Sequence, residues 1–110
     1  MRARPYKMDK GRLEPCLIDE ATHVMLHLPG PLPNRLIPVQ TRGKRHGTPN
    51  WTWNGDTELP TLRPSILTKG ADASGDHVCH SWVNEGKVKF LNDCTHELAG
   101  QTLDLLEVEE

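Results

Sequence analysis

Aromatic residues are scarce in this sequence, and long hydrophobic runs are missing altogether. Aromatics make up 5% of the 110 residues and hydrophobic residues 35%, and the mean hydropathy is -0.59. A chain of this length has room for one hydrophobic core, and this chain has little apolar material to fill it. We therefore predict a single domain over residues 1–110 that gains stability from an additional element such as a bound metal ion.

The chain also lacks the features of a membrane or secreted protein. No segment approaches the roughly 18 to 20 apolar residues of a membrane-spanning helix, and the first residues lack the apolar stretch of a signal peptide. Three cysteines, Cys16, Cys79 and Cys94, cannot all pair within the chain. In a reducing compartment, cysteines near histidines are better interpreted as metal ligands than as disulfides. We expect a cytoplasmic protein that does not associate with a membrane.

Positive and negative charges are unevenly distributed, although the net charge is only -2. Residues 1–45 carry nine Lys or Arg against four Asp or Glu, and residues 46–110 carry four against eleven. Two solvated surfaces of opposite charge account for this pattern. A nucleic-acid interface would need aromatic residues for base stacking, and only Tyr6 lies among the basic residues. We therefore do not expect a nucleic-acid partner.

No segment predicts a helix longer than about two turns, whereas several segments have the alternation of β-strands. Residues 22–28 alternate apolar and polar side chains, and residues 51–53 place two tryptophans on one face before an Asn54–Gly55 turn. Residues 59–68 predict a strand with a proline at its edge or at a bulge. Residues 1–20 show no pattern except a strand that could begin at Cys16, and residues 69–76 predict a loop.

The expected fold class is therefore mainly β, a small antiparallel sheet or sandwich with long loops. Residues 1–48 form a basic, proline-containing N-terminal part, and residues 49–110 form the core that carries the motifs described next.

Two β-rich runs, residues 77–83 and 88–93, flank a compact turn at residues 84–87. If this turn closes a hairpin, Val83 lies opposite Val88, and His77 lies opposite Cys94. Because side chains alternate between the two faces of a strand, His77, Cys79 and Cys94 share one face. His96 leaves the strand on the same side, so four potential metal ligands converge.

Two thiolates and two imidazoles are a common ligand set for structural Zn²⁺. We predict one Zn²⁺ bound by His77, Cys79, Cys94 and His96 on the C-terminal hairpin. A slip of one residue in the pairing would substitute His80 for His77. The alternative is a pair of buried free cysteines with histidines on the surface.

The opposite face of the same hairpin carries His80 and Asp93 as diagonal neighbours. A carboxylate beside an imidazole is how enzymes orient a general base, and Ser65 or Ser81 could supply a nucleophile. The sequence lacks the Gly-x-Ser-x-Gly elbow of many hydrolases. A structural hydrogen bond between His80 and Asp93 is the alternative interpretation.

Several linked motifs identify a resemblance to known proteins. They are Trp51-x-Trp-Asn-Gly, Pro60-Thr-Leu-x-Pro-Ser-Ile66, Cys79-His80, Gly86-x-Val-x-Phe-Leu and Asp93-Cys-Thr-His-Glu-Leu-Ala-Gly-Gln101. Together they resemble a family of small phage and prophage proteins, many of which are mislabelled "ammonia monooxygenase". That family is similar to the predicted peptidase component of bacterial ubiquitin-like conjugation operons. The resemblance covers roughly residues 49–106.

The resemblance implies a β-rich domain in the bacterial cytoplasm with Cys79, His80, Asp93 and His96 at motif positions. It also implies hydrolytic chemistry on a protein substrate. His77 is outside the motif pattern, which raises His80 as its substitute on the metal. A zinc-bound His80 could not serve a Ser/His/Asp device, and Asp93 would then be the candidate base of a metal-activated water.

Two functions follow from these observations. The first is a zinc-stabilised interaction module of phage or prophage origin that binds a host protein. The alternative is a zinc-containing hydrolase, a peptidase acting on ubiquitin-like or other protein conjugates, with Ser65, His80 and Asp93 as catalytic residues. An unligated His80 near Ser65, or a metal with an open position, would favour the peptidase, and a closed site of four protein ligands would favour the module.

Overall fold

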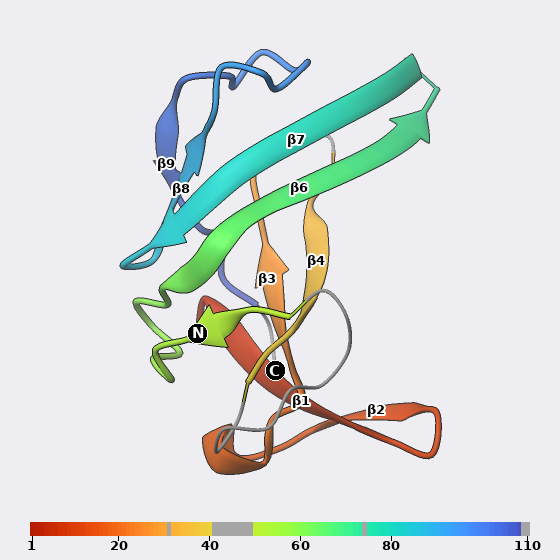
Figure 1. Cartoon of the computed structure of the whole chain (residues 1–110), viewed down its shortest axis with the longest axis vertical. Helices are drawn as coiled ribbons and strands as arrows, with labels where there is room; N and C mark the ends of the chain where they lie inside the picture. The colour runs from red at the N-terminus through yellow and green to blue at the C-terminus, as the bar shows by residue number, and fades with distance from the viewer. Residues whose placement is uncertain (31, 41–49, 74, 109–110) are drawn as a thin grey trace.

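The computed structural model describes residues 1–30, 32–40, 50–73 and 75–108, and they form two antiparallel β-sheets (Figure 1). The first sheet has the strand order β2-β1-β3-β4. Its strands are β1 (Ala3–Asp9), β2 (Arg12–Pro15), β3 (His23–His27) and β4 (Asn34–Pro38). The mainly β, antiparallel prediction is confirmed.

The second sheet has the order β5-β6-β7-β8-β9 and contains the long hairpin seen in Figure 1. Its strands are β5 (Thr52–Trp53), β6 (Leu62–Asp72), β7 (Gly75–Asn84), β8 (Lys87–Phe90) and β9 (Thr102–Asp104). The described residues contain a single helical element, the 3₁₀ turn η1 (Ile18–Glu20). The described part of the chain therefore has no helix with the length and apolarity that a bilayer crossing needs.

Alternation of apolar and polar residues decides which face each strand buries. In β3, Val24 and Leu26 are fully buried, whereas Met25 between them and His23 and His27 on either side are half-buried. Strands of the second sheet bury their own inward residues in the same way. One hydrophobic cluster takes side chains from both sheets, including Ala3, Val24, Leu26, Ile37, Leu62, Ile66, Val83, Val88 and Phe90. The two sheets therefore pack face to face as a sandwich.

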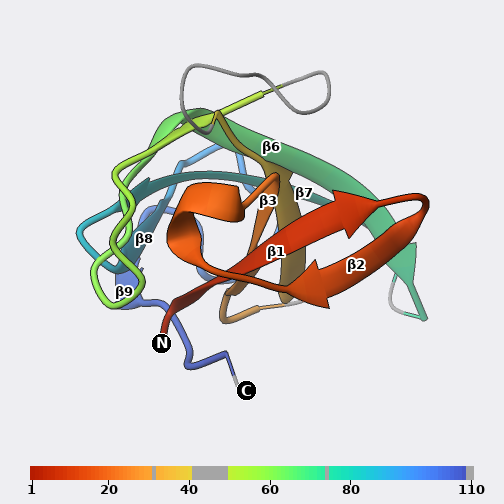
Figure 2. The same ribbon diagram turned by 90° about the horizontal axis from the view of Figure 1, so that it is seen from below.

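The two chain ends lie side by side, as Figure 2 shows. The Val108 amide donates to the Met1 carbonyl over 2.7 Å, and the N-terminal ammonium lies 2.7 Å from the Glu107 carboxylate. The ammonium group lowers the pKa of Glu107 through this hydrogen bond. These contacts join the start of β1 to the segment after β9.

The N-terminal residues form a hairpin that the sequence analysis did not predict. Residues Lys10 and Gly11 both have positive φ angles, 50° and 79°, and connect β1 to β2. A two-residue loop with two positive φ values matches the twist of the strands that it joins. The expected strand at Cys16 is wrong, since β2 ends at Pro15 and the chain then enters η1.

Residues 69–72, 75 and 76 are also strand rather than part of the expected loop. Lys69–Asp72 of β6 pair with Gly75–Val78 of β7, which extends the hairpin well beyond the predicted strand. The sequence analysis missed this strand because its residues are mostly small or polar, and such residues have low strand propensity. Strand propensity also depends on the surroundings of each side chain, which the sequence does not show. Gly70 serves packing here, since a Cβ at this position would lie 2.9 Å from the Leu32 side chain.

The predicted register of the β7–β8 hairpin is confirmed over four pairs, from Asn84–Lys87 to Ser81–Phe90. Gly86 closes the turn with a φ of 77°. Beyond Phe90 the ladder stops, and residues 92 and 93 form a turn. The Thr95 amide then donates to the Val78 carbonyl over 3.0 Å, two positions away from its predicted partner. An even shift keeps each side chain on its predicted face.

Truncation of Leu26 should test the shared core. Leu26→Ala removes a fully buried side chain, and we expect it to lower the free energy of unfolding by about 2–5 kcal/mol. The matched control, Leu17→Ala, truncates an exposed leucine and should change stability by less than about 0.5 kcal/mol. Urea denaturation of both variants is the measurement, and equal losses would contradict a core common to both sheets.

Candidate functional site

Ser65 lies on β6 at an irregularity in the sheet. The β6–β7 register shifts between Leu62, which pairs with Val83, and Ile66, which pairs with Ser81. Four steps along β6 therefore match two steps along β7, and the extra residues form a bulge around Pro64, as the sequence predicted. Ile66 is buried, so its neighbour Ser65 points to the outer face of the sheet.

On that outer face, three side chains form a linear hydrogen-bonded chain. Ser65 Oγ lies 2.9 Å from His80 Nε2, and His80 Nδ1 lies 2.9 Å from Asp93 Oδ2. A carboxylate can only accept, so Nδ1–H donates to Asp93 and Nε2 is left to accept the Ser65 hydroxyl proton. This arrangement positions an imidazole to remove a proton from a serine.

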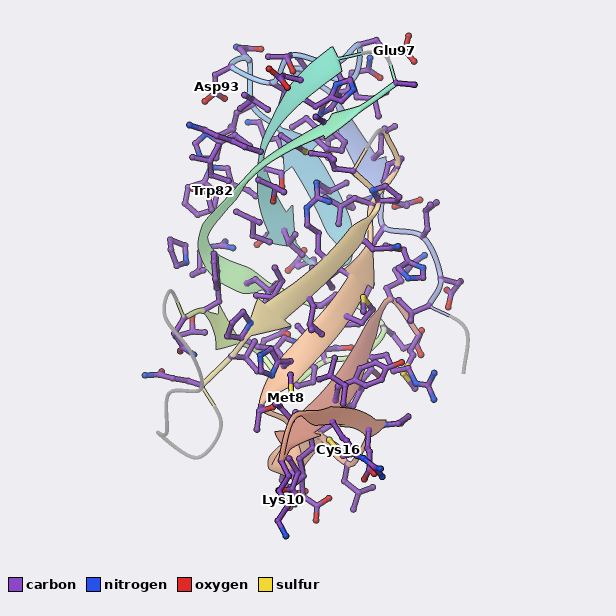
Figure 3. All side chains as sticks on the ribbon, turned by 90° about the vertical axis from the view of Figure 1, so that its right-hand side faces the viewer. Met8, Lys10, Cys16, Trp82, Asp93 and Glu97 are labelled. Atoms are coloured by element: carbon purple, nitrogen blue, oxygen red, sulfur yellow. The ribbon has the colours of Figure 1, made fainter. Side chains whose placement is uncertain are left out.

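The triad is open to solvent. His80 is 25% exposed and Asp93 is 60% exposed, and Figure 3 shows Asp93 and Trp82 on the same side of the molecule. The exposed Leu67 lies directly opposite His80 in the ladder. The guanidinium of Arg63 lies 5.3 Å from the centre of the Trp82 ring on this face. A macromolecule can therefore reach Ser65 from the outer side of the second sheet.

Ser81, the other serine considered as nucleophile, faces the opposite way. It is buried, and its Oγ has no hydrogen-bond partner among the described residues. Its neighbours in the ladder, Ile66 and Phe90, belong to the hydrophobic core. The geometry therefore brings Ser65, and not Ser81, to the His80–Asp93 pair.

The inner face of the same hairpin carries a group with the chemistry of a metal site. The ligand atoms of Cys79, Cys94 and His96 all lie within 4.8 Å of one another, and both cysteines are buried and unpaired. Burial raises the pKa of the Cys79 thiol, and the nearby Arg35 guanidinium opposes that rise. Burial lowers the pKa of the His96 imidazole, and the charges of His77 and Arg35 act in the same direction.

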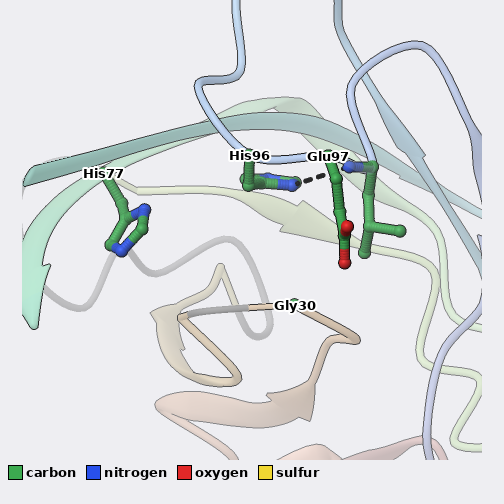
Figure 4. Close-up of a pocket in the computed structure, with 5 residues that line it drawn as sticks. Gly30, His77, His96 and Glu97 are labelled. Carbon is green, nitrogen blue, oxygen red and sulfur yellow. Dashed lines mark hydrogen bonds between the residues drawn. The ribbon is translucent and has the colours of Figure 1, made fainter. Parts of the chain in front are cut away.

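His77, the predicted fourth ligand, is not a member of this group. The two-residue shift beyond Phe90 brings Cys94 towards Cys79 and leaves His77 farther along β7. His77 and His96 line a cavity of about 380 Å³ together with Gly30, Glu97 and Leu98, and Figure 4 shows how His77, His96 and Glu97 lie around it. The Leu98 amide donates to His96 Nδ1 over 3.3 Å. His80, the predicted substitute, is instead bonded to Ser65 and Asp93 on the other face.

Arg35 is a buried cation that the sequence analysis missed. It is 4% exposed, and its Nη1 donates to the carbonyls of Leu32 and Asn34. Its Nε and Nη2 have no hydrogen-bond partner among the described residues. A charged residue in a short edge strand is usually exposed, so only the packing of the two sheets reveals that this guanidinium, on β4, lies near the Cys79 thiol of β7.

Cys94 connects the two faces. The His80 amide donates to Cys94 Sγ over 3.2 Å, and the Cys94 thiol lies 3.1 Å from the His80 carbonyl oxygen. These contacts hold the turn that carries Asp93 against the strand that carries His80. The Phe90 ring, edge-on to His96 with centroids 4.8 Å apart, closes the inner side.

Comparison with known proteins gives one match. The family model described as bacterial ubiquitination-like system serine protease (BubE) matches residues 32–91. This range includes Ser65, Cys79 and His80 and ends two residues before Asp93. No curated protein sequence and no solved structure matches the chain.

Thiol accessibility should distinguish the three cysteines. Cys16 is half-exposed, near the end of the molecule opposite Asp93 (Figure 3), whereas Cys79 and Cys94 are buried. With a colorimetric disulfide reagent, we expect one fast-reacting thiol in the native protein and three after denaturation. The Cys16→Ser variant should lose the fast phase, and a fast phase that remains in this variant would contradict the burial of the other two thiols.

Proposed function

Since the chain belongs to the family of bacterial ubiquitination-like system serine proteases (BubE), we propose that it is a peptidase that cleaves ubiquitin-like or other protein conjugates. Ser65 is the nucleophile, His80 the general base and Asp93 the carboxylate that orients the base. The observation that carries this proposal is the pair of 2.9 Å hydrogen bonds that joins the three side chains. The proposed site of action is the bacterial cytoplasm, and the protein partner is the substrate.

The reaction follows from the protonation states of the triad. As Ser65 Oγ attacks the substrate carbonyl carbon, its proton moves to His80 Nε2. His80 then gives this proton to the leaving group as the scissile bond breaks, which leaves an acyl ester on Ser65. Water attacks the ester with His80 again as base, and the acid product leaves. Throughout, Asp93 accepts from Nδ1–H and stabilises the imidazolium.

Substrate binding should complete this open site. Asp93 is 60% exposed, and solvent weakens the interaction between its carboxylate and an imidazolium. A protein substrate that covers the outer face would remove water from the triad and strengthen both hydrogen bonds. Leu67 offers an exposed apolar contact for such a substrate beside His80.

A fluorophosphonate probe, which forms a covalent bond with activated serines, tests this function. We expect labelling of the wild-type protein and its complete loss in Ser65→Ala. Asp93→Asn should slow labelling by about 10²–10⁴-fold, because the imidazole loses the acceptor that sets its tautomer. Intact mass and the rate of labelling are the measurements.

Ser81→Ala is the matched control, since it removes a buried hydroxyl that has no partner among the described residues. This variant should be labelled at the wild-type rate. Labelling of folded Ser65→Ala, or no labelling of any serine in the wild type, would refute the proposed nucleophile.

A second proposal concerns the thiol group on the inner face. We propose that Cys79, Cys94 and His96 hold a structural Zn²⁺. The soft thiol ligands suit this ion, and His96 Nε2 is buried without a hydrogen-bond partner among the described residues. Arg35 would donate N–H groups to the thiolates as an outer hydrogen-bond donor. The ion would stabilise the fold, and no step of the Ser65 reaction involves it.

Metal removal should therefore destabilise the protein. We expect one zinc per chain by elemental analysis, and a strong chelator should lower the Tm by more than about 5 °C. Cys94→Ser should lose both the metal and the effect of the chelator, while Cys16→Ser should keep both. His77→Ala should keep the metal, because His77 is outside the ligand group. A wild-type Tm that does not respond to the chelator would exclude a structural metal.

A further inference from the structure

Among the described residues, the strand that carries Ser65 lacks a neighbouring strand on one side beyond its short pairing with β5. β5 pairs with β6 only at Leu62 and Arg63. In the part of the chain that the structure describes, no strand lies along residues 66–72 on the side opposite β7. Such an edge presents main-chain donors and acceptors that an extended peptide can use.

Two observations show which residues of β6 direct their backbone groups outwards. Trp51 Nε1 donates to the Ser65 carbonyl over 3.3 Å from the open side of the strand. On the other side of β7, the carbonyls of His80 and Val78 accept from Leu91 and Thr95, so these two residues of β7 face away from β6.

Backbone groups in an antiparallel sheet alternate between the two neighbours of a strand. Since His80 and Val78 face away from β6, their ladder partners Leu67 and Lys69 face away from β7. The N–H and C=O groups of Leu67 and Lys69 therefore point out of the open edge. The backbone groups of Thr68, which lies between them, and of Ile66, which precedes Leu67, point towards β7.

A groove runs along this edge. Its volume is about 350 Å³, and it lies between β4 and β6. Apolar side chains form much of its lining, among them Leu36, Pro38, Trp51, Ile66 and Leu67. Leu67 is 54% exposed and lies opposite His80 in the ladder. An added strand would place every second side chain into this groove.

We infer that the open edge of β6 binds the substrate as an added antiparallel strand, through main-chain hydrogen bonds to Leu67 and Lys69. This inference rests on the proposed peptidase function and specifies its substrate as an extended, unfolded peptide segment. The bound segment needs apolar side chains at alternate positions, because most of the residues that line the groove are apolar.

The position of Trp51 sets the point on β6 at which pairing with the bound segment begins. The Trp51 indole N–H already bonds to the Ser65 carbonyl, so the main-chain hydrogen bonds between β6 and the bound segment begin at Leu67. An antiparallel segment runs from Lys69 towards Leu67, and the residues that precede the scissile bond make these contacts. At Trp51 the segment leaves the plane of the sheet for the outer face, where the Ser65 hydroxyl is located.

Peptide length is the experimental variable that tests this mode of binding. Diphenyl phosphonates react with activated serines, and two can be compared: acetyl-leucine phosphonate and acetyl-leucyl-alanyl-leucine phosphonate. The longer compound should inactivate the protein about tenfold faster, since it adds main-chain hydrogen bonds to Leu67 and Lys69. N-methylation of the backbone nitrogens of its first leucine and its alanine should abolish this tenfold increase in the rate at which it inactivates the wild-type protein.

A proline substitution provides an independent test. Leu67→Pro removes an N–H that faces away from β7, and the ratio of the two inactivation rates should fall to about one. Leu13→Pro is the control, because Leu13 is at the β2 edge of the other sheet. The Cys16 amide donates to the Pro5 carbonyl of β1. Backbone groups alternate in direction along a strand, and Leu13 is an odd number of residues from Cys16, so the Leu13 N–H points away from β1. This variant should keep the tenfold ratio.

The outcomes separate the two claims. If the fluorophosphonate and both phosphonates leave Ser65 unmodified, the peptidase function is wrong and this inference falls with it. If the single-residue phosphonate reacts but the longer one gains nothing, the function stands and edge binding is overturned. A gain that survives N-methylation would mean that side chains alone recognise the substrate, which also overturns the inference.

Discussion

The contact between Cys94 Sγ and the backbone of His80 is the interaction on which the functional part of this molecule depends. The His80 amide and carbonyl both bond to this sulfur atom, over 3.2 and 3.1 Å. The contact fixes the turn after β8 against β7, and this turn carries Asp93. Together with the main-chain hydrogen bonds from Leu91 to His80 and from Thr95 to Val78, it positions the exposed Asp93 carboxylate that bonds to the His80 imidazole.

Alternation along β7 then keeps two kinds of chemistry apart. Cys79 points into the sandwich towards Cys94 and His96, whereas its neighbour His80 points out towards Ser65. A histidine on the outer face cannot also join the inner ligand group. The proposed structural and catalytic roles therefore need no compromise between them, and a metal on the inner face would stabilise the strand that carries His80.

Much of the site was predictable because it depends on local rules. The turn at residues 84–87 sets the register of β7 and β8, and a period of two then assigns His80 and Asp93 to one face and the cysteines to the other. His77 was included as a ligand because the ladder was extended too far. The turn at Asn92 and Asp93 shifts Cys94 by two positions, and these two turn-favouring residues are the local signal that the prediction overlooked.

The sequence by itself determined the β class, the alternation that divides the two faces, and the residues able to carry chemistry. These properties follow from side-chain polarity and turn preference within a few neighbouring residues. Only the tertiary structure decided that Ser65 reaches His80 across fifteen residues of chain, that Arg35 is buried near Cys79, and that no described strand covers the edge of β6 beyond Arg63. Those features depend on packing between strands from distant parts of the chain, which short-range patterns do not encode.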